Sequence, residues 1–358
     1  MTTHRVAVLP GDGIGAEVVP PALRLLERAG ELFGFTFAWT EFDWGCEYYR
    51  ANGAMMPADG LDALAEHDEI FLGAVGSPGV EDHVSLWGLL IPIRRRFRQY
   101  INLRPIKLLR GVTSPLRDVQ AGDIDFLVVR ENNEGEYSEI GGRLYRGTPQ
   151  ELAVQESVFT RVGVERALRY AFDLARSRER SLCSATKSNG IIHTMPFWDE
   201  ICREVAAEYA DVEVAAYHID ALAALFVLRP QTLDVVVASN LFGDILTDLG
   251  AALVGSIGIA PSANLNPERE HPSMFEPIHG SAPDIAGKGV ANPIGQIWSG
   301  AMMLDHLGHG AAAGAMLAAV EDVLGDGEVR TPDLGGTADT AAVTEAILGA
   351  LDDHKPAG

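Results

Sequence analysis

Short apolar runs alternate with longer segments of helical periodicity along most of this 358-residue chain. The strand-like runs include VAVLP, EIFLGAVG, DFLVVREN and DVVVASN, and segments such as PPALRLLERAGELFG lie between them. Strands that alternate with helices predict an α/β fold, because a crossing helix returns the chain to a parallel neighbouring strand. The segment EGEYSEIGGRLYRGTPQELAVQESVFT breaks this rhythm. It is polar and alternating, which predicts an exposed β-hairpin arm within residues 134–160.

The composition limits the classes of function that are open to the chain. Apolar residues make up 47% of the sequence and charged residues 22%, enough for a sizeable core. The formal net charge of −22 argues against nucleic acid as a partner, because a polyanion would be repelled. Scattered cysteines without C-x-x-C spacing predict a reducing compartment and no zinc site. With no signal peptide and no membrane-spanning apolar stretch, we expect a soluble, cytoplasmic protein without a membrane partner.

The segment VLPGDGIGA carries the spacing of a dinucleotide-binding fingerprint, with Gly11, Gly13 and Ala16 at the required positions. Two features argue against that interpretation. Asp12 would repel a pyrophosphate, and the acidic residue expected about 20 positions later comes late, at Glu41. The alternative is a tight strand-to-helix turn whose glycines supply positive φ angles.

Arginines are concentrated in the segment LWGLLIPIRRRFRQYINLRP of this acidic chain. Arg104 stands before a proline at the start of a predicted strand, and Arg130 ends the apolar run DFLVVR. Ligands of α/β sheets bind at strand ends, and guanidinium groups bind carboxylates bidentately. The arginines therefore indicate a di- or tricarboxylate ligand. For Arg95, Arg96 and Arg98 a solvated helix face remains the alternative.

Asp244 and Asp248 stand four residues apart at the start of a predicted helix, in NLFGDILTDLGAAL. This spacing places both carboxylates on one helix face, within reach of one ion. Oxygen ligands alone indicate a hard cation, Mg²⁺ or Mn²⁺, and Asp220 is a candidate third ligand. Interaction of Asp244 with the helix dipole is the alternative. Tyr137 and Lys187 become candidate proton donors and acceptors if they share a cleft with these groups; ordinary surface positions are the alternative.

At these positions the sequence resembles the metal-dependent β-decarboxylating dehydrogenases, the isocitrate and isopropylmalate dehydrogenase family. NLFGDILTDLGAALVGSIGIAPSANL resembles the signature of that family, and FEPIHGSAPDIAGKGVANP resembles its cofactor loop. The resemblance implies two α/β domains around a mixed, largely parallel sheet that is not a Rossmann fold. Residues 1–103 plus 252–358 would form the cofactor-side domain. Residues 104–251, including the arm, would form the substrate and dimerisation domain.

The resemblance also implies roles for individual residues. The substrate carboxylates would be held by Arg94, Arg104 and Arg130. Tyr137 would protonate the enol after CO₂ leaves, and Lys187, reaching in from a second subunit, would accept the hydroxyl proton. The divalent ion would lie between Asp244, Asp248 and the partner subunit's Asp220. These shared sites imply a homodimer.

The cofactor loop implies NAD rather than NADP. Asp284 resembles the family residue that accepts hydrogen bonds from the adenosine ribose. NADP-dependent relatives have Lys and Tyr where this chain has Asp284 and Ile285, and a carboxylate there would repel a 2′-phosphate. The other residues expected to bind the cofactor are His279, Gly280, Ser281, Ala282, Asn292 and Asn189. The early glycines would then shape a turn near the cofactor without forming the fingerprint.

Within the family, HVSLWGLLIPIRRRF and ATKSNG are most similar to the D-malate and tartrate dehydrogenase branch. Trp87, Leu90 and Ile91 would share one helix face, where Trp87 occupies volume that a branched substrate would need. A place for Trp87 in the hydrophobic core is the alternative. The isocitrate enzymes place Ser and Asn where this chain has Gly88 and Leu90, so a third carboxylate would lack partners.

We therefore expect NAD-dependent oxidative decarboxylation of D-malate to pyruvate and CO₂, of tartrate, or of both. Two alternatives remain open. One is 3-isopropylmalate dehydrogenase, and the other is a regulatory subunit that binds ligand without turnover. The resemblance also leaves open whether a monovalent cation is required.

Overall fold

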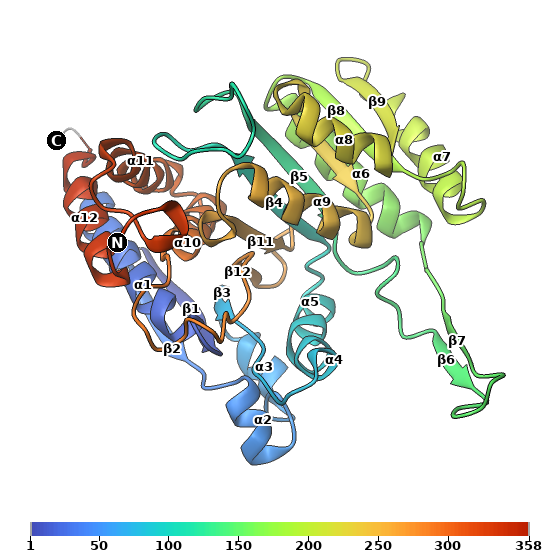
Figure 1. Cartoon of the computed structure of the whole chain (residues 1–358), viewed down its shortest axis with the longest axis horizontal. Coiled ribbons are helices and arrows are strands. Elements are labelled where there is room, and N and C mark those ends of the chain that lie inside the picture. The colour runs from blue at the N-terminus through green and yellow to red at the C-terminus, as the bar shows by residue number, and fades with distance from the viewer. Residues whose placement is uncertain (1, 357–358) are drawn as a thin grey trace.

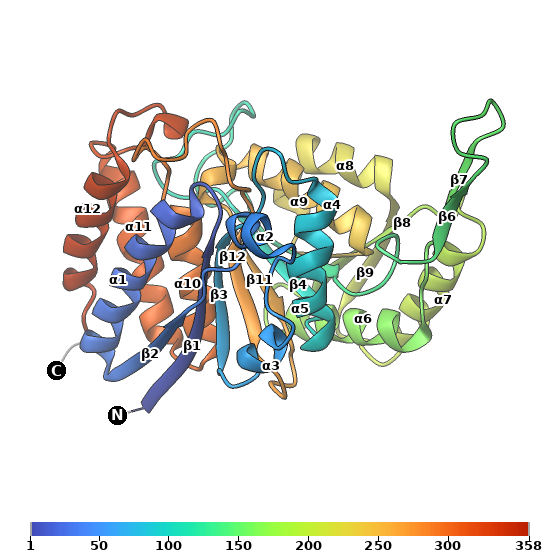
Figure 2. The same ribbon diagram turned by 90° about the horizontal axis from the view of Figure 1, so that it is seen from below.

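The computed structural model of the chain describes residues 2–356. One ten-stranded sheet runs through the molecule, with helices on both faces and a two-stranded hairpin that projects at one side (Figures 1 and 2). In sheet order the strands are β2 (Phe35–Glu41), β1 (Thr2–Gly11), β3 (Glu69–Ala74), β12 (Ser273–Pro277), β11 (Pro261–Leu265), β4 (Ile101–Lys107), β5 (Asp125–Glu131), β10 (Val235–Ala238), β8 (Ser181–Thr186) and β9 (Glu213–His218).

The strand directions divide this sheet into two parallel flanks and an antiparallel centre. β2, β1, β3 and β12 run parallel to one another, as do β5, β10, β8 and β9, whereas β11 and β4 are antiparallel to both of their neighbours. This mixed, largely parallel order confirms the predicted α/β class and differs from the mostly parallel Rossmann sheet. The predicted domain boundary at residues 103 and 104 lies inside β4, in a sheet that continues across it. The division into domains stays a prediction.

The helices group by flank (Figure 1). Their bounds are α1 (Gly15–Phe33), α2 (Cys46–Asn52), α3 (Gly60–Leu64), α4 (Asp82–Ser85), α5 (Ile91–Arg96), α6 (Arg161–Arg176), α7 (Thr194–Ala206), α8 (Ile219–Leu228), α9 (Asn240–Leu253), α10 (Ile294–His306), α11 (Gly310–Asp326) and α12 (Thr340–Asp353). α1, α10, α11 and α12 pack together beside the N-terminal flank, whereas α6 packs with α7 and α8 with α9 on the other. Within residues 2–356, no helix is long and apolar enough to cross a membrane.

α1 shows how the sequence sets these elements. Its buried residues Val18, Ala22 and Leu25 recur at the three- and four-residue spacing of one helix face. Gly34 ends the helix in the left-handed region, at a φ of 87°, and its N–H bonds to the carbonyl of Gly30. The predicted helical pattern is thus confirmed, with a glycine at the position where helices commonly stop.

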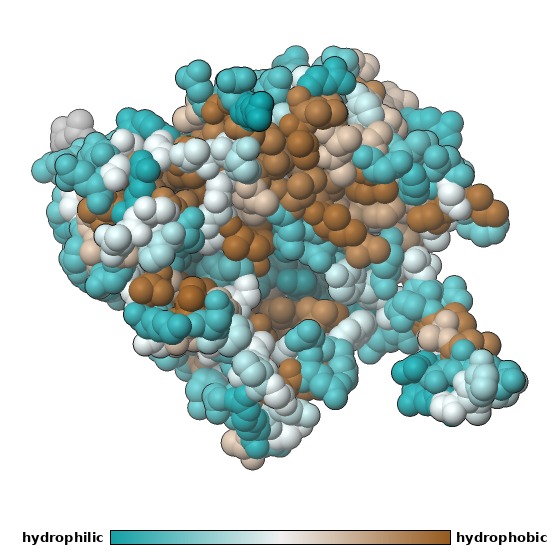
Figure 3. Space-filling model, viewed as in Figure 1, coloured by the Kyte–Doolittle hydropathy of each residue, from teal (hydrophilic) through white to brown (hydrophobic). Residues whose placement is uncertain are grey.

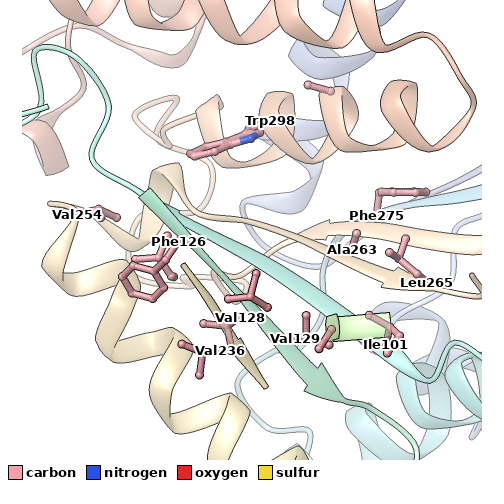
Figure 4. Packing of buried hydrophobic residues seen from close by; sticks show 14 of the residues in the cluster. Ile101, Phe126, Val128, Val129, Val236, Val254, Ala263, Leu265, Phe275 and Trp298 are labelled. Carbon is pink, nitrogen blue, oxygen red and sulfur yellow. The ribbon is translucent and has the colours of Figure 1, made fainter. Parts of the chain in front are cut away.

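The main hydrophobic core extends across both flanks. Figure 4 shows Phe126 and Val128 on β5, Val236 on β10, Phe275 on β12 and Trp298 on α10, all members of one buried cluster. Each large apolar side chain buried in this way contributes roughly 1.5–3 kcal/mol. This packing holds β4, β5 and α9 in fixed relation to one another.

The predicted hairpin arm is present as β6 (Gly141–Leu144) and β7 (Leu152–Gln155), which pair antiparallel. It projects away from the rest of the chain in both views (Figures 1 and 2). Its apolar side chains are exposed in a single chain: Ile140 is 57% and Tyr145 is 66% exposed.

Candidate active site

A cavity of about 180 Å³ lies where α5, β4, β5 and α9 meet. The residues that line it are Leu86, Ile91, Arg94, Arg95, Arg104, Arg130, Asn132, Asn133, Tyr137, Asn240 and Asp244. Four arginines thus face one carboxylate, in a chain whose formal net charge is −22. This local excess of positive charge suits an anionic ligand.

β4 and β5 bring two of the predicted arginines to one face of the sheet. Arg104 lies opposite Val128 in the antiparallel ladder, and Arg130 follows Val128 by two residues, so both side chains leave the same face. Both arginines are buried. Arg104 lies in the middle of β4 rather than at its start, because the strand already pairs with its neighbours from Ile101 onwards.

α9 supplies the partners of Arg130. A Cβ atom at Gly243 would lie 2.6 Å from the Cβ of Arg130, so only glycine lets the helix approach β5 this closely. Arg130 then donates from Nε and Nη2 to Asn240 Oδ1, at 3.0 and 2.6 Å, and from Nη1 to Asp244. Asn240 is absent from the predicted site. It lies one turn before Asp244, and the four-residue spacing that singled out Asp248 would also have found it.

The two predicted metal ligands differ in their surroundings. Arg104 joins them, with Nη2 at 3.6 Å from Asp244 Oδ1 and Nη1 at 3.6 Å from Asp248 Oδ1. Burial acts to raise the pKa of Asp244, but Arg130 and then Arg104 outweigh it and lower that pKa. Burial raises the pKa of Asp248, which Arg104 only partly offsets. Asp244 is therefore the more firmly ionised of the two.

Tyr137 reaches the same carboxylate from the loop after β5. Its hydroxyl donates to Asp244 Oδ2 at 3.1 Å, and the guanidinium of Arg130 lies 5.7 Å from the centre of its ring. Burial, and then the charge of Asp244, raise the pKa of Tyr137. The hydroxyl keeps its proton and is placed to donate it within the cavity.

Arg94 enters the cavity from α5 with a carboxylate behind it. Its Nη2 lies 2.8 Å from Glu276 Oε1 on β12, and the two side chains are only 11% and 10% exposed. Sequence reasoning missed Glu276, because a single acidic residue in FEPIHG forms no local pattern.

Leu86 and Ile91 form the apolar wall of the cavity, where Trp87 and Leu90 were expected with Ile91. The chain between α4 and α5 makes a π-helical turn, in which the N–H of Ile91 bonds to the carbonyl of Leu86. This wider turn brings residues five apart onto one face, in place of residues three or four apart. Trp87 lies instead against Arg95, whose guanidinium carbon is 5.0 Å from the centre of the Trp87 ring. The roles of Trp87 and Leu90 in substrate choice stay predictions.

Lys187 and Asp220 lie outside this cavity lining and pair with each other. Lys187 Nζ is 2.8 Å from Asp220 Oδ1, and this hydrogen bond lowers the pKa of Asp220. In the part of the chain that the structure describes, no three histidine, cysteine, aspartate or glutamate side chains gather as a metal site. A single chain thus provides Asp244 and Asp248 alone, and the contribution of the partner subunit's Asp220 stays a prediction.

The glycine turn after β1 is engaged with the rest of its own chain. A Cβ atom at Gly13 would lie 2.1 Å from the carbonyl oxygen of Ser281, and the N–H of Ile14 donates to that oxygen at 2.9 Å. The carboxylate of Asp12 accepts from two backbone N–H groups of neighbouring loops, each at 2.9 Å. The N–H groups of Asp12, Ile14 and Gly15 are bonded to backbone carbonyl groups, so the glycine spacing marks a packed turn.

The predicted cofactor loop lies between β12 and α10, against α1. Glu17 in α1 accepts from the N–H of Gly289 at 3.0 Å and also from that of Gly287. Ile285 packs on the small apolar cluster that Ile14 and Val18 of this region form. Gly280 is exposed, and Ala282 adopts a φ of 40°, so the loop turns sharply beside the glycine turn.

Two side chains of this loop are candidates for contact with a ligand. Asp284 is exposed, and His279 is buried with a ring Nε2 that has no hydrogen-bond partner among residues 2–356. Such groups fit a nucleotide, which carries hydroxyl donors and ring nitrogens. Asn292 differs, because its amide donates internally at 3.1 Å and accepts internally at 3.0 Å. Asn189 lies on an exposed turn after β8, on the other flank of the sheet.

Comparison with known proteins decides the relationship. The chain matches the family described as isocitrate/isopropylmalate dehydrogenase over residues 5–347. The chain belongs to the isocitrate/isopropylmalate dehydrogenase family. The predicted family is confirmed, and the chain is an enzyme of the dehydrogenase class.

The relatives of this dehydrogenase match it along nearly its whole length. It is 55% identical over 353 residues to the probable tartrate dehydrogenase/decarboxylase of Bacillus subtilis (strain 168), covering 98% of this chain and 99% of the relative. It is 56% identical over 355 residues to the D-malate dehydrogenase [decarboxylating] of Escherichia coli (strain K12), covering 97% and 98%. The crystal structure of isocitrate dehydrogenase from Methylococcus capsulatus superimposes with a TM-score of 0.88 at 35% identity, covering 97% and 99%.

Proposed function

We propose that this enzyme catalyses the NAD-dependent oxidative decarboxylation of D-malate to pyruvate and CO₂, and that it also accepts tartrate. The observation that carries the proposal is the cavity, in which Arg94, Arg104 and Arg130 converge within about 180 Å³. That volume is below the roughly 300–1,000 Å³ of sites for larger ligands, which favours a small diacid over a branched one. The names of the Bacillus and Escherichia relatives support the same substrates.

The residues of the cavity divide the work of the reaction. The arginines bind the two carboxylates, and their positive charge helps to orient the diacid beside Tyr137. The hydroxyl proton of C2 passes to the partner subunit's Lys187, and the C2 hydride would leave to the acceptor that NAD supplies, which gives a 2-oxo diacid. The bond from C3 to its carboxylate then breaks, CO₂ leaves, and the electron pair remains as an enolate. Tyr137 donates its proton to C3 of that enolate, which gives pyruvate.

Asp244 and Asp248 would hold Mg²⁺ or Mn²⁺. They fit a hard cation because they present carboxylate oxygens one helical turn apart, joined through Arg104 at 3.6 Å on each side. The substrate oxygens and the partner subunit's Asp220 would complete the ligand set. When bound, the cation supplies polarisation of the C2 oxygen and stabilises the negative charge that develops on it.

The loop after β12 would bind NAD, which supplies the acceptor for the C2 hydride when it is bound. Asp284 is exposed there and would face the adenosine ribose. A 2′-phosphate would meet this carboxylate, so we expect a strong preference for NAD⁺ over NADP⁺ in kcat/KM. The double variant Asp284→Lys with Ile285→Tyr should relax that preference. Equal kcat/KM values for the two cofactors in the unmodified enzyme would contradict this assignment.

A second copy of the chain would complete the site. Apolar side chains gather over α8 and α9 (Figure 3), where Leu228 is 74% and Ile245 is 54% exposed. An exposed apolar patch of this kind marks an interface, and the exposed apolar residues of the hairpin arm support the same interpretation. Because Lys187 and Asp220 lie outside the cavity lining of their own chain, a homodimer would let them serve the neighbouring one.

The proposed function is tested by kcat/KM for D-malate, tartrate, 3-isopropylmalate and isocitrate, measured with NAD⁺ and Mn²⁺. The highest value should be for D-malate or tartrate, at least tenfold above 3-isopropylmalate. A higher kcat/KM for 3-isopropylmalate would replace the proposal with 3-isopropylmalate dehydrogenase activity. Repeating the assay with and without K⁺ decides whether a monovalent cation is required.

A further inference from the structure

A connected set of buried amide side chains lies directly behind the cavity. Its centre is Asn264 on β11, which is fully buried and does not line the cavity. Asn264 Nδ2 donates to Glu276 Oε1 at 2.7 Å. Asn264 Oδ1 accepts from Asn102 Nδ2 at 3.0 Å and from Asn132 Nδ2 at 2.9 Å. The set thus touches both Glu276, the partner of Arg94, and Asn132, which lines the cavity.

The carboxylate of Glu276 fixes the orientation of every amide in the set. An ionised carboxylate only accepts hydrogen bonds, so Asn264 must turn its Nδ2 toward Glu276 and its Oδ1 toward Asn102 and Asn132. Asn132 must then turn its Nδ2 inward, where it also donates to the carbonyl of Gln99 at 3.0 Å. Its Oδ1 has no hydrogen-bond partner within residues 2–356 and is the end left for a ligand.

The same arrangement limits the freedom of Arg94. Glu276 Oε1 receives two donors, Arg94 Nη2 at 2.8 Å and Asn264 Nδ2 at 2.7 Å, which together fix the position of this oxygen. A guanidinium bound to a fixed oxygen keeps one orientation, so the remaining N–H groups of Arg94 are held ready for a carboxylate before it arrives. Such preorganisation reduces the cost of binding.

We propose that Asn264 is a positioning residue for the dicarboxylate substrate. It fixes Arg94 through Glu276 and fixes Asn132 directly, so one buried amide sets two groups that line the cavity. The inference rests on the proposed function only in that the ligand is a dicarboxylate.

Asn264→Asp tests this role. The variant keeps the shape of the side chain and the acceptor for Asn102 and Asn132, but it turns a second carboxylate toward Glu276. The KM for D-malate should rise about 10- to 100-fold, the effect of losing one well-placed hydrogen bond to a charged group, with a smaller change in kcat. The KM for NAD⁺ should stay unchanged, because the cofactor loop is not part of the amide set.

Two further variants separate positioning from a structural role. Asn264→Asp combined with Glu276→Gln again pairs a donor with an acceptor, now donated from the amide at position 276 to the carboxylate at position 264, and restores the original net charge. It should recover most of the KM for D-malate. Asn266→Asp is the matched control. Asn266 is equally buried two residues later, and its Nδ2 also faces a carboxylate, Glu268 at 3.3 Å. This control should lower the melting temperature without changing the KM for D-malate.

The inference is overturned if Asn264→Asp leaves the KM for D-malate unchanged, if it raises both KM values equally, or if the double variant recovers stability alone. Asn264→Ser, which keeps a hydroxyl donor, replaces Asn264→Asp if the latter does not fold.

If the unmodified enzyme turns over no diacid, the proposed function fails. Calorimetric titration with D-malate and Mn²⁺ then decides: weaker binding in Asn264→Asp alone supports the positioning role, and equal binding in all variants contradicts it.

Discussion

The central cavity and the glycine turn after β1 are built in opposite ways. In the cavity the contacts are made by side chains, for example by the guanidinium of Arg130 on Asn240 and Asp244. In the turn the closest approach is made by the backbone, because Gly13 has no side chain and lies against the carbonyl of Ser281. This difference explains why one sequence pattern predicted a ligand site and the other did not. Charged residues next to predicted strands marked the cavity, whereas the glycine spacing marked only a close backbone approach.

The two regions also differ in what stabilises them. The cavity places buried arginines close together, and burial, with the neighbouring Arg130, lowers the pKa of Arg104 to about 10. An anionic ligand between these groups would relieve their repulsion. The close approach in the glycine turn depends instead on the absence of a Cβ atom at Gly13. Charge substitutions should therefore affect the first region, and volume substitutions the second.

The largest expected effect is on proton transfer in the cavity. Tyr137→Phe removes the hydroxyl that lies 3.1 Å from Asp244 Oδ2 and should lower kcat about 10²–10⁴-fold, the usual contribution of a general acid. The KM for D-malate should change much less. Tyr48→Phe, on α2, is the control and should behave as the unmodified enzyme. A normal kcat for Tyr137→Phe would show that another group delivers the proton.

A smaller effect is expected from removing one charge of the cavity. Arg104→Met should raise the KM for D-malate about 30- to 1,000-fold, the range for losing one partner of a buried charge pair, and should leave the KM for NAD⁺ near its original value. The control is Arg96→Met, since the side chain of Arg96 is 52% exposed and pairs with Asp62 at the surface. If Arg104→Met changed both KM values alike, the cavity would not be a separate substrate site.

Gly13→Ala tests the glycine turn, as Arg104→Met tests the cavity. Its Cβ would lie 2.1 Å from the oxygen of Ser281, so the cofactor loop must move. The KM for NAD⁺ should rise about tenfold, as expected for overpacking, while the KM for D-malate stays nearly constant. Gly53→Ala is the matched control, because Gly53 also has a positive φ, 75°, but an added Cβ would meet nothing within 4 Å. Equal effects of the two substitutions would attribute the loss to backbone strain alone.

The smallest expected effect concerns Glu69, a buried carboxylate outside the cavity. Burial raises the pKa of Glu69 to about 8 and lowers that of His306, 3.5 Å away, to about 4. Glu69 takes up a proton on folding, so its contribution to stability is lost as the pH rises toward 8. His306 gives one up, so its contribution is lost as the pH falls below 6.5.

Between pH 4.5 and 6.5 the contributions of Glu69 and His306 to the free energy of unfolding change in opposite directions as the pH rises. Above pH 6.5 only the contribution of Glu69 still changes. The melting temperature should therefore fall from about pH 6.5 to 8.5, and Glu69→Gln should reduce this fall by a few degrees. Glu66→Gln at the exposed surface should leave the fall unchanged. A pH profile of Glu69→Gln identical to that of the unmodified enzyme would contradict the raised pKa.

Much of the fold and of the cavity could be predicted because the signals are local. The alternation of apolar runs gave the α/β class, and Asp244 was found from helical spacing within one segment. Arg104 and Arg130 were found because they stand at the start and the end of predicted strands, beside a proline and an apolar run. These signals need only a few neighbouring positions.

The remaining features depend on tertiary structure. Glu276 and Asn264 acquire their roles from strands that meet across the sheet, and nothing near them in sequence shows this. The π-helical turn moved the apolar wall from Trp87 to Leu86, because its hydrogen bonds skip one more residue than an α-helix. The proposed roles of Lys187 and Asp220 would require a second chain.

The most direct test of the account is the stoichiometry of the reaction with D-malate, NAD⁺ and Mn²⁺. We predict that NADH, CO₂ and pyruvate form in equal amounts, and that a chelator stops the formation of all three until Mn²⁺ is restored. Formation of NADH and oxaloacetate without CO₂, or equal turnover in the presence of the chelator, would contradict it.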